Sequence, residues 1–195
     1  MTLAVEGDTD VPVARRLLST VALEIGQVYG RQGKGRLSQR LAGYNHAAFR
    51  TPWFVIRDLD HDAPCAPDLV RQLLPLRAPQ MCFRVAIRSA EAWLLADRER
   101  MARFLGVSET LLHPDPAALP HPKRTLIDLA RRSRKRAIRE DLVPAEGTSA
   151  QVGPGYAARV REFASELWRP EAAAQLSPSL AGCLEALRRW ALIIQ

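Results

Sequence analysis

The chain has 195 residues, of which 47% are hydrophobic and 25% charged, as expected of an ordinary globular protein with one well-buried domain. No stretch approaches the about 18 uninterrupted apolar residues of a membrane span, and the first residues do not resemble a signal peptide, so we expect a cytoplasmic protein with no membrane partner. The net charge of +7 and pI near 10 favour an anionic partner, although an arginine-rich proteome would produce the same excess.

Two acidic residues follow the first predicted strand. Residues 2–5 are typical of a strand, and the apolar positions between 11 and 21 have helical spacing. Glu6 therefore ends a strand, and Asp10 stands where the helix begins. The alternative is that Asp10 is a simple helix cap and Glu6 an acid of a surface loop.

A basic, glycine-rich segment follows the second predicted strand. Residues 24–29 alternate well enough for a strand near the edge of a sheet, and residues 30–36 indicate a flexible loop that contains Lys34. The loop would let the backbone approach a phosphate, but it lacks the P-loop pattern, so a solvated loop is an equal alternative. Residues 37–49 predict a helix.

Three alternate aspartates follow the most apolar strand of the chain. Residues 53–56 are aromatic or β-branched, as in a strand that is buried on both faces, and Asp58, Asp60 and Asp62 come directly after them. Carboxylates this close repel one another by about 4 kcal/mol per pair near a protein surface, and a divalent cation is the usual compensation. The alternative is a set of solvated aspartates before a turn. In either case His61 is expected to be a bystander of the loop, with a role as proton carrier as the alternative.

A third acidic residue follows the fourth predicted strand. Residues 68–74 predict a short helix and residues 81–87 a strand, after which Ser89 is placed to cap a helix that continues to about residue 105. Glu91 lies in the first turn of that helix, where a surface glutamate favoured by the helix dipole is the alternative. The carboxyl ends of parallel strands meet at one edge of a sheet, so acids after three strands predict a shared site there.

The second half of the chain is predicted to be helical. A proline-rich stretch at 108–122 suggests an α/β core over residues 1–107 and a helical C-terminal extension over residues 108–195. Helices are expected over 123–139, 156–168 and 178–194, with a loop at 146–155. The first of these helices would carry a basic cluster, which is either a solvated face or a nucleic-acid contact: Arg131, Arg132, Arg134, Lys135 and Arg136.

Three motifs together resemble the Toprim domain of topoisomerases, primases, small RNA maturases and OLD-type nucleases. Glu6-Gly7 after the first strand and Asp58-x-Asp60 after a later one match its signature, and OLD-type members also have an acid four residues on, here Asp10. The segment Glu-Ala-Trp-Leu-Leu-Ala-Asp at 91–97 resembles a family of small stand-alone Toprim-like bacterial proteins of unknown function, as do Pro122-Lys123 and the helix start near Pro178.

The resemblance implies a Toprim-like α/β fold with a mostly parallel sheet of about four strands flanked by helices. It also implies a nuclease dependent on Mg²⁺ or Mn²⁺, in which Glu6, Asp58 and Asp60 hold the metal, while Asp10 and Glu91 complete a second site or position water. Lys34 or nearby arginines would stabilise the transition state. The implied partners are nucleic acid, with DNA favoured over RNA, and an ATPase encoded nearby, as in phage-defence systems.

Two other functions fit the same residues. One is a Toprim-like partner of an ATPase that cuts nothing itself, or only when assembled. The other is a phosphatase of the haloacid dehalogenase type, in which Asp58 would attack phosphorus and Asp60 would be the acid. Here His61-Asp62 replaces the Gly-Thr that follows this motif in that family.

Overall fold

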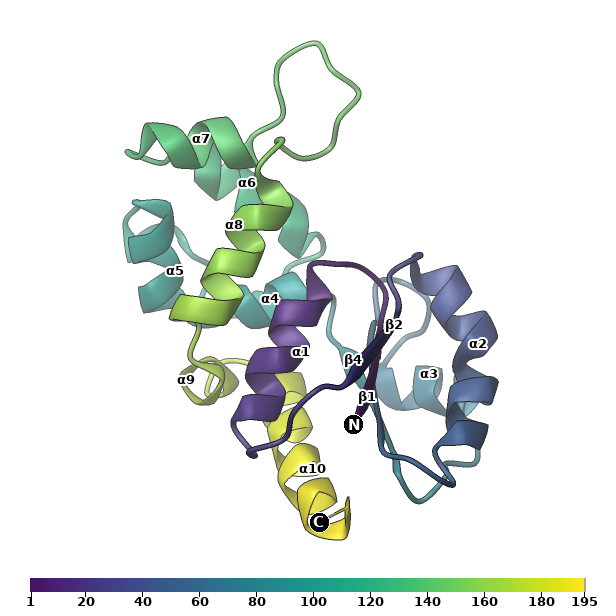
Figure 1. Cartoon of the computed structure of the whole chain (residues 1–195). Helices are drawn as coiled ribbons and strands as arrows, with labels where there is room; N and C mark the ends of the chain where they lie inside the picture. Colours follow the sequence, from purple (N-terminus) through teal and green to yellow (C-terminus); the bar gives the residue numbers. More distant parts are fainter. Residues whose placement is uncertain (195) are drawn as a thin grey trace.

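Four short strands form one parallel sheet at the centre of the computed structural model, which describes residues 1–194 (Figure 1). The strands are β1 (Thr2–Val5), β2 (Gln27–Gly30), β3 (Trp53–Asp58) and β4 (Met81–Ala86), and their order in the sheet is β2-β1-β3-β4. The predicted α/β class, with a parallel sheet of four strands and a C-terminal helix, is therefore confirmed.

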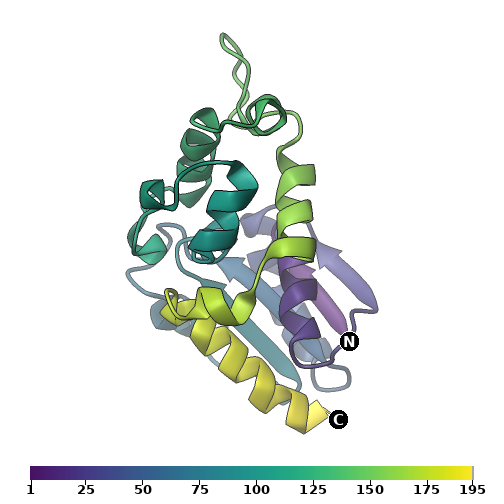
Figure 2. The ribbon, with the colours of Figure 1, turned by 90° about the vertical axis from the view of Figure 1, so that its left-hand side faces the viewer.

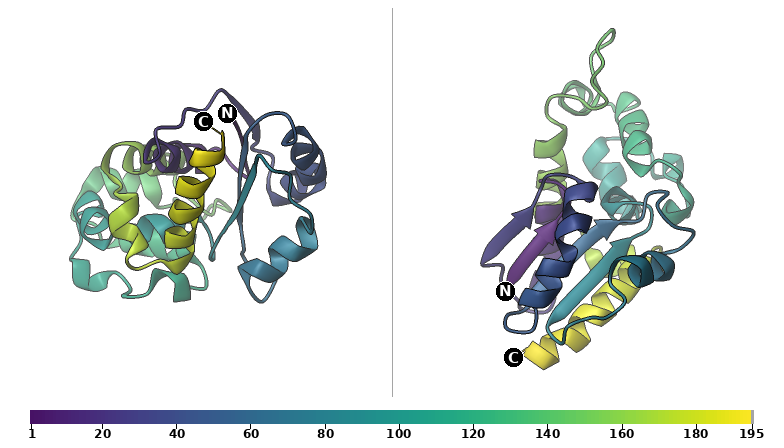
Figure 3. Two further views of the ribbon diagram at one scale, coloured as in Figure 1. Left: turned by 90° about the horizontal axis from the view of Figure 1, so that it is seen from below. Right: turned by 90° about the vertical axis from the view of Figure 1, so that its right-hand side faces the viewer.

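Helices cover both faces of this sheet (Figure 3). They are α1 (Asp10–Ser19), α2 (Lys34–Ala47), α3 (Ala66–Leu73), α4 (Ala90–Leu95), α5 (Arg98–Leu105), α6 (Pro122–Arg131), α7 (Arg136–Leu142), α8 (Tyr156–Glu162), α9 (Pro170–Ala174) and α10 (Pro178–Ile194). Short 3₁₀ turns occupy Glu109–Leu111 and Pro116–Ala118, and a π-helical segment at Phe163–Leu167 extends α8. Within residues 1–194, no helix combines the length and the apolar character that crossing a membrane requires.

Alternate side chains of each strand enter two separate apolar layers, because successive residues of a strand point to opposite faces. Leu3 of β1 and Phe54 of β3 pack with α1, α4 and α10, together with the later helices. Ala4 and Val55, one residue further along each strand, pack with α2 and α3. This burial on both faces explains why the strands read as continuous apolar runs rather than alternating ones.

The order of the strands places a crevice beside the ends of β1 and β3. The chain leaves β1 toward β2 on one side and returns through α2 to β3 on the other side of β1. Ligands of open parallel sheets bind at such a reversal, beyond the carboxyl ends of the strands. Glu6 and Asp58 stand at the ends of these two strands.

Several predicted elements have different bounds in the structure. The second strand begins at Gln27 rather than at residue 24, and Lys34 is the first residue of α2 rather than part of a flexible loop. The helix expected from Ser89 to about residue 105 is divided into α4 and α5, because Asp97 lies outside helical geometry and caps α5 by accepting from the N–H of Arg100. The single helix expected over 123–139 is α6 followed by α7, with a turn between them.

Candidate active site

Five acidic residues lie at the carboxyl edge of the sheet, where the parallel strands direct them. Glu6 follows β1, Asp10 opens α1, Asp58 ends β3, Asp60 lies two residues beyond β3, and Glu91 lies in the first turn of α4. Repulsion from Asp10, Glu91, Glu6 and Asp60 acts on Asp58, which places Asp58 at the centre of the group. The structure thus brings together the acids that the sequence assigned to one site.

Three of these carboxylates are each held by a backbone N–H group. The N–H of Asp58 donates to Oε1 of Glu6 at 2.9 Å, and the N–H of Gly7 donates to Oδ2 of Asp10 at 2.8 Å. The N–H of Ala90 donates to Oδ1 of Asp58 at 3.0 Å, so this carboxylate occupies the place at the start of α4 where the Ser89 side chain was expected to cap. The hydrogen bonds fix one oxygen of each group, and within residues 1–194 none of the three carboxylates forms an ion pair.

Burial without a cationic partner raises the pKa values of these carboxyls. Burial raises the pKa of Glu6 to about 7, against the opposing effects of the Asp58 N–H and the Arg57 charge. Burial and the charge of Glu91 raise the pKa of Asp10 to about 6. Burial and the four neighbouring carboxylates raise the pKa of Asp58 well above its usual range. Ionisation of these carboxyls is therefore opposed by their surroundings, and a bound cation would favour their charged forms.

Glu91 differs from the other acids because both of its oxygens have protein donors. Ser89 donates its hydroxyl to Oε2 at 2.7 Å, and Tyr156 of α8 donates to Oε1 at 2.9 Å. Lys123 of α6 lies 3.5 Å from the same Oε1 and 5.6 Å from the centre of the Tyr156 ring. Glu91 thus joins α4, α6 and α8 around a buried carboxylate, and burial together with the Glu91 charge raises the pKa of Tyr156.

Lys34 connects the acidic edge to the loop that follows β3. Its Nζ lies 2.9 Å from Asp60 and 3.0 Å from Asp62, and hydrogen bonds to these two carboxylates raise its pKa. Asp62 also accepts from the buried guanidinium of Arg57 at 2.7 Å. Although burial alone would raise the pKa of Asp62, the hydrogen bonds from Lys34 and Arg57 hold it below its usual range.

The backbone beyond β3 is held in an unusual conformation that sets the position of Asp60. Asp60 has a φ of 48°, in the left-handed region that aspartate tolerates better than most residues. Its N–H donates to the carbonyl of Arg88, and Nη1 of Arg88 donates back to the carbonyl of Asp60 at 2.7 Å. Asp60 is therefore fixed by the β4–α4 connection rather than carried by a loose turn.

An open cleft of about 820 Å³ lies over this edge of the sheet. One wall contains Asp58, Asp60, Asp62 and Glu91, together with the two cations Lys34 and Arg88. A second wall is formed by α6 and by Pro144, Ala150 and Gln151 of the loop after α7, which projects from the molecule in Figure 2. His61 and His121, whose ring centres are 5.8 Å apart, line the cleft from the two sides.

The predicted basic cluster is not one helical surface beside these acids. It covers the end of α6, a turn and the start of α7, and only Arg131 of the five residues lines the cleft. Lys135 donates to the carbonyls of Arg103 and Phe104, and Arg136 pairs with Glu140 at 2.7 Å. Lys135 and Arg136 are therefore occupied by close intramolecular contacts, and Arg132 and Arg134 are exposed outside the cleft.

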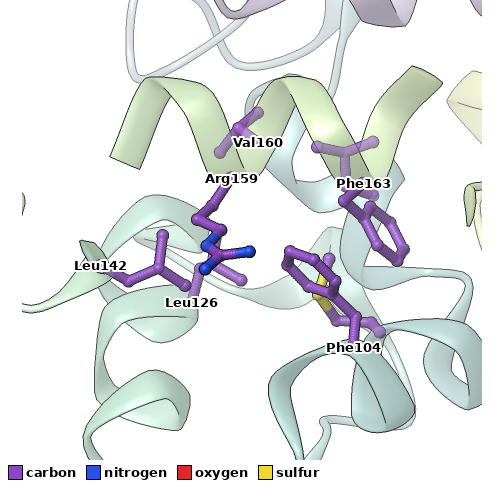
Figure 4. Close-up of a pocket in the computed structure, with 8 residues that line it drawn as sticks. Phe104, Leu126, Leu142, Arg159, Val160 and Phe163 are labelled. Carbon is purple, nitrogen blue, oxygen red and sulfur yellow. The ribbon is translucent and has the colours of Figure 1, made fainter. Parts of the chain in front are cut away.

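A second cavity, inside the helical part, is too small to be a ligand site. Its volume is about 10 Å³, and a single water molecule needs about this much space. Figure 4 shows its lining, in which Phe104, Leu126 and Phe163 face one another beside the guanidinium of Arg159. The cavity is a packing defect between α5, α6 and α8.

Within residues 1–194, no three Asp, Glu, His or Cys side chains are already arranged as a metal site. The chemistry of the site nevertheless fits a hard cation, because its donors are carboxylate oxygens without cysteine or imidazole. Among the described residues, Oε2 of Glu6 and Oδ2 of Asp58 have no hydrogen-bond partner.

Four residues that contact the acidic group have no role in the site predicted from the sequence. Arg57 could have been found from its place as the one charge inside an apolar strand, and Asp62 from its alternation with Asp58. Tyr156 and Lys123 carry no such signal, because they lie far from Glu91 in the sequence and meet it only through the packing of α6 and α8.

Comparison with known proteins found no relative of this chain. No family model matches the chain, and neither the curated proteins nor the solved structures contain a match to it.

Proposed function

We propose that this protein is a metal-dependent nucleic-acid phosphodiesterase of the Toprim type, using Mg²⁺ or Mn²⁺. The observation that carries the proposal is the group of carboxylates at the strand-order reversal, in which Asp10 is buried and Glu6 and Asp58 are half-buried, without an ion pair among the described residues. A cluster of carboxylates lowers the stability of the fold, and such destabilising clusters are found mainly at functional sites.

Glu6 and Asp58 would hold the metal through their free oxygens, with Asp10 and Asp60 completing its surroundings. A bound divalent ion lowers the pKa of the attacking water and offsets charge on the leaving oxygen. Because both oxygens of Glu91 are engaged, its part would be to keep α4, α6 and α8 in place around Asp58 rather than to bind the metal directly.

The cations of the same wall would act on the scissile phosphate. The raised pKa of Lys34 keeps its ammonium charged near neutral pH, and the group lines the cleft. Held between Asp60 and Asp62, it is oriented before substrate binds, which is how electrostatic stabilisation of a transition state becomes effective.

The test is Mn²⁺-dependent cleavage of single-stranded DNA, plasmid DNA and RNA by wild type and by the variants Asp58→Asn and Glu6→Gln. We expect each variant to lose about 100-fold or more of the cleavage rate, because each removes a charged ligand and leaves the shape unchanged. Glu185→Gln, which changes an exposed acid of α10, is the matched control and should cleave as wild type does.

A second measurement separates loss of chemistry from loss of fold. Asp58→Asn keeps the acceptor for the N–H of Ala90 but removes the repulsion, so its melting temperature without metal should equal or exceed that of wild type. Equal cleavage by wild type and both variants would refute the proposal. Mn²⁺ binding through these carboxylates without cleavage would instead favour a partner protein that is active only in an assembly.

A further inference from the structure

We propose that a single-stranded segment of nucleic acid lies in the cleft with its phosphates against one face of α6, formed by Lys123, Arg124 and Arg131. The inference rests on the proposed function and names the substrate class and the residues that contact its backbone. It also divides the basic cluster read from the sequence, because Arg131 belongs to this surface and the residues after it do not.

The two walls of the cleft carry opposite charge, as metal and substrate would require. The sheet-edge wall contributes four carboxylates, whereas α6 contributes three cations and the single acid Asp128. Arg124 and Arg131 are seven residues apart, close to two helical turns, so they project from the same side of α6. Phosphates along this side would face the carboxylates at the position where cleavage is proposed.

Two of the three α6 cations, Arg124 and Arg131, are free to contact a ligand, whereas Lys123 already lies beside Glu91. The side chains of Arg124 and Arg131 are 81% and 56% exposed, and they approach Asp128 only at 4.0 and 3.9 Å. Exposed pairs of this kind contribute little to stability, so both arginines can exchange Asp128 for a phosphate.

The shape of the cleft favours one strand over a duplex. Its volume of about 820 Å³ lies in the range of sites that bind small ligands, and Pro144, Ala150 and Gln151 line it together with α6. A duplex holds its strands apart across a major groove about 12 Å wide and needs an open face. The imidazoles of His61 and His121 offer flat surfaces to unstacked bases inside the cleft.

The experiment measures binding by fluorescence anisotropy, in EDTA so that nothing is cleaved. The two labelled probes are a single-stranded 20-mer and a hairpin whose duplex stem contains the same sequence. Arg124→Ala/Arg131→Ala is compared with Arg132→Ala/Arg134→Ala, which removes the same charge from exposed positions outside the cleft. We expect the first variant to bind the single strand at least tenfold more weakly. Its slope of log affinity against log salt should fall by about 1.4, at about 0.7 per lost phosphate contact.

The second variant should bind within about threefold of wild type, since its arginines act only through long-range charge. Equal losses of single-strand affinity in the two variants would overturn the inference. So would tighter binding of the hairpin than of the single strand by wild type. If the α6 variant binds and cleaves as wild type does, the inference fails while the proposed function stands. If binding follows the expected pattern without metal-dependent cleavage, the proposed function fails alone.

Discussion

At the scale of single residues, the main feature is a set of carboxylates whose environment opposes their ionisation. Glu6, Asp10 and Asp58 are largely buried, each accepts one backbone N–H, and none has a cationic partner among the described residues. Asp60 and Asp62, two and four residues beyond Asp58, are paired with Lys34 instead. Lys34 thus neutralises Asp60 and Asp62, whereas Glu6, Asp10 and Asp58 are left without a counter-ion.

This difference predicts how the stability of the metal-free protein depends on pH. The pKa of Glu6 is raised to about 7 and that of Asp10 to about 6, so the folded protein binds more protons than the unfolded chain between about pH 4 and 7. The stability that these two carboxyls contribute should therefore be fully present below their unfolded pKa values and be lost as pH rises through 6 and 7. Allowing for the partial exposure of Glu6, we expect a loss of about 1 to 3 kcal/mol.

Urea denaturation in EDTA at several pH values between 5 and 8 measures this loss. Glu6→Gln should flatten the profile because it removes one of the carboxyls with a raised pKa, whereas the surface control Glu185→Gln should leave it unchanged. A wild-type stability that rises steadily from pH 5 to 8 would contradict the prediction.

At the scale of elements, Glu91 explains how helices that are distant in the sequence are held beside the sheet edge. Its carboxylate accepts from Ser89 on its own connection and from Tyr156 of α8, and it lies beside Lys123 of α6. A buried carboxylate needs several donors, so each of these elements has one energetically favoured position.

Removal of one donor should therefore loosen α8. We expect Tyr156→Phe to lower the free energy of unfolding by about 1.5 to 3 kcal/mol, the range for a hydrogen bond to a charged group. Tyr29→Phe, which removes an exposed hydroxyl bonded to Gln27 in the same strand, should change it by less than about 0.5 kcal/mol. Urea unfolding at pH 8 measures the free energy of unfolding of both variants. Similar losses for Tyr156→Phe and Tyr29→Phe would count against an anchoring role for Glu91.

At the scale of the whole molecule, the C-terminal helices are joined to the sheet core by buried polar contacts as well as by apolar packing. The indole of Trp93 donates to Ser179 near the start of α10, and the indole of Trp168 donates to the carbonyl of Trp93. The side chain of Asp97 is 1% exposed and accepts from both the backbone and the guanidinium of Arg169. The helical extension is thereby fixed against α4 and α5.

Arg169→Ala should be among the most destabilising surface substitutions, because it leaves Asp97 as an unpaired buried charge. The expected loss is about 3 to 5 kcal/mol in the free energy of unfolding. Arg189→Ala breaks an exposed pair with Glu185 in α10 and should cost less than about 1 kcal/mol. Chemical denaturation distinguishes these values, and a loss below 1 kcal/mol for Arg169→Ala would contradict a joining role for the Asp97 pair.

The sequence by itself determined the sheet and the residues at its edge. Apolar runs and turn residues mark the four strands to within a few positions, and parallel strands bring the ends of β1 and β3 together, so Glu6 and Asp58 could be assigned to one place. Only the tertiary structure decided the partners of these acids. Tyr156 and Lys123 reach Glu91, and α6 faces the sheet edge, through the packing of helices far apart in the chain. The physical reason is that local patterns encode backbone periodicity and burial, whereas side-chain partners depend on how distant elements pack.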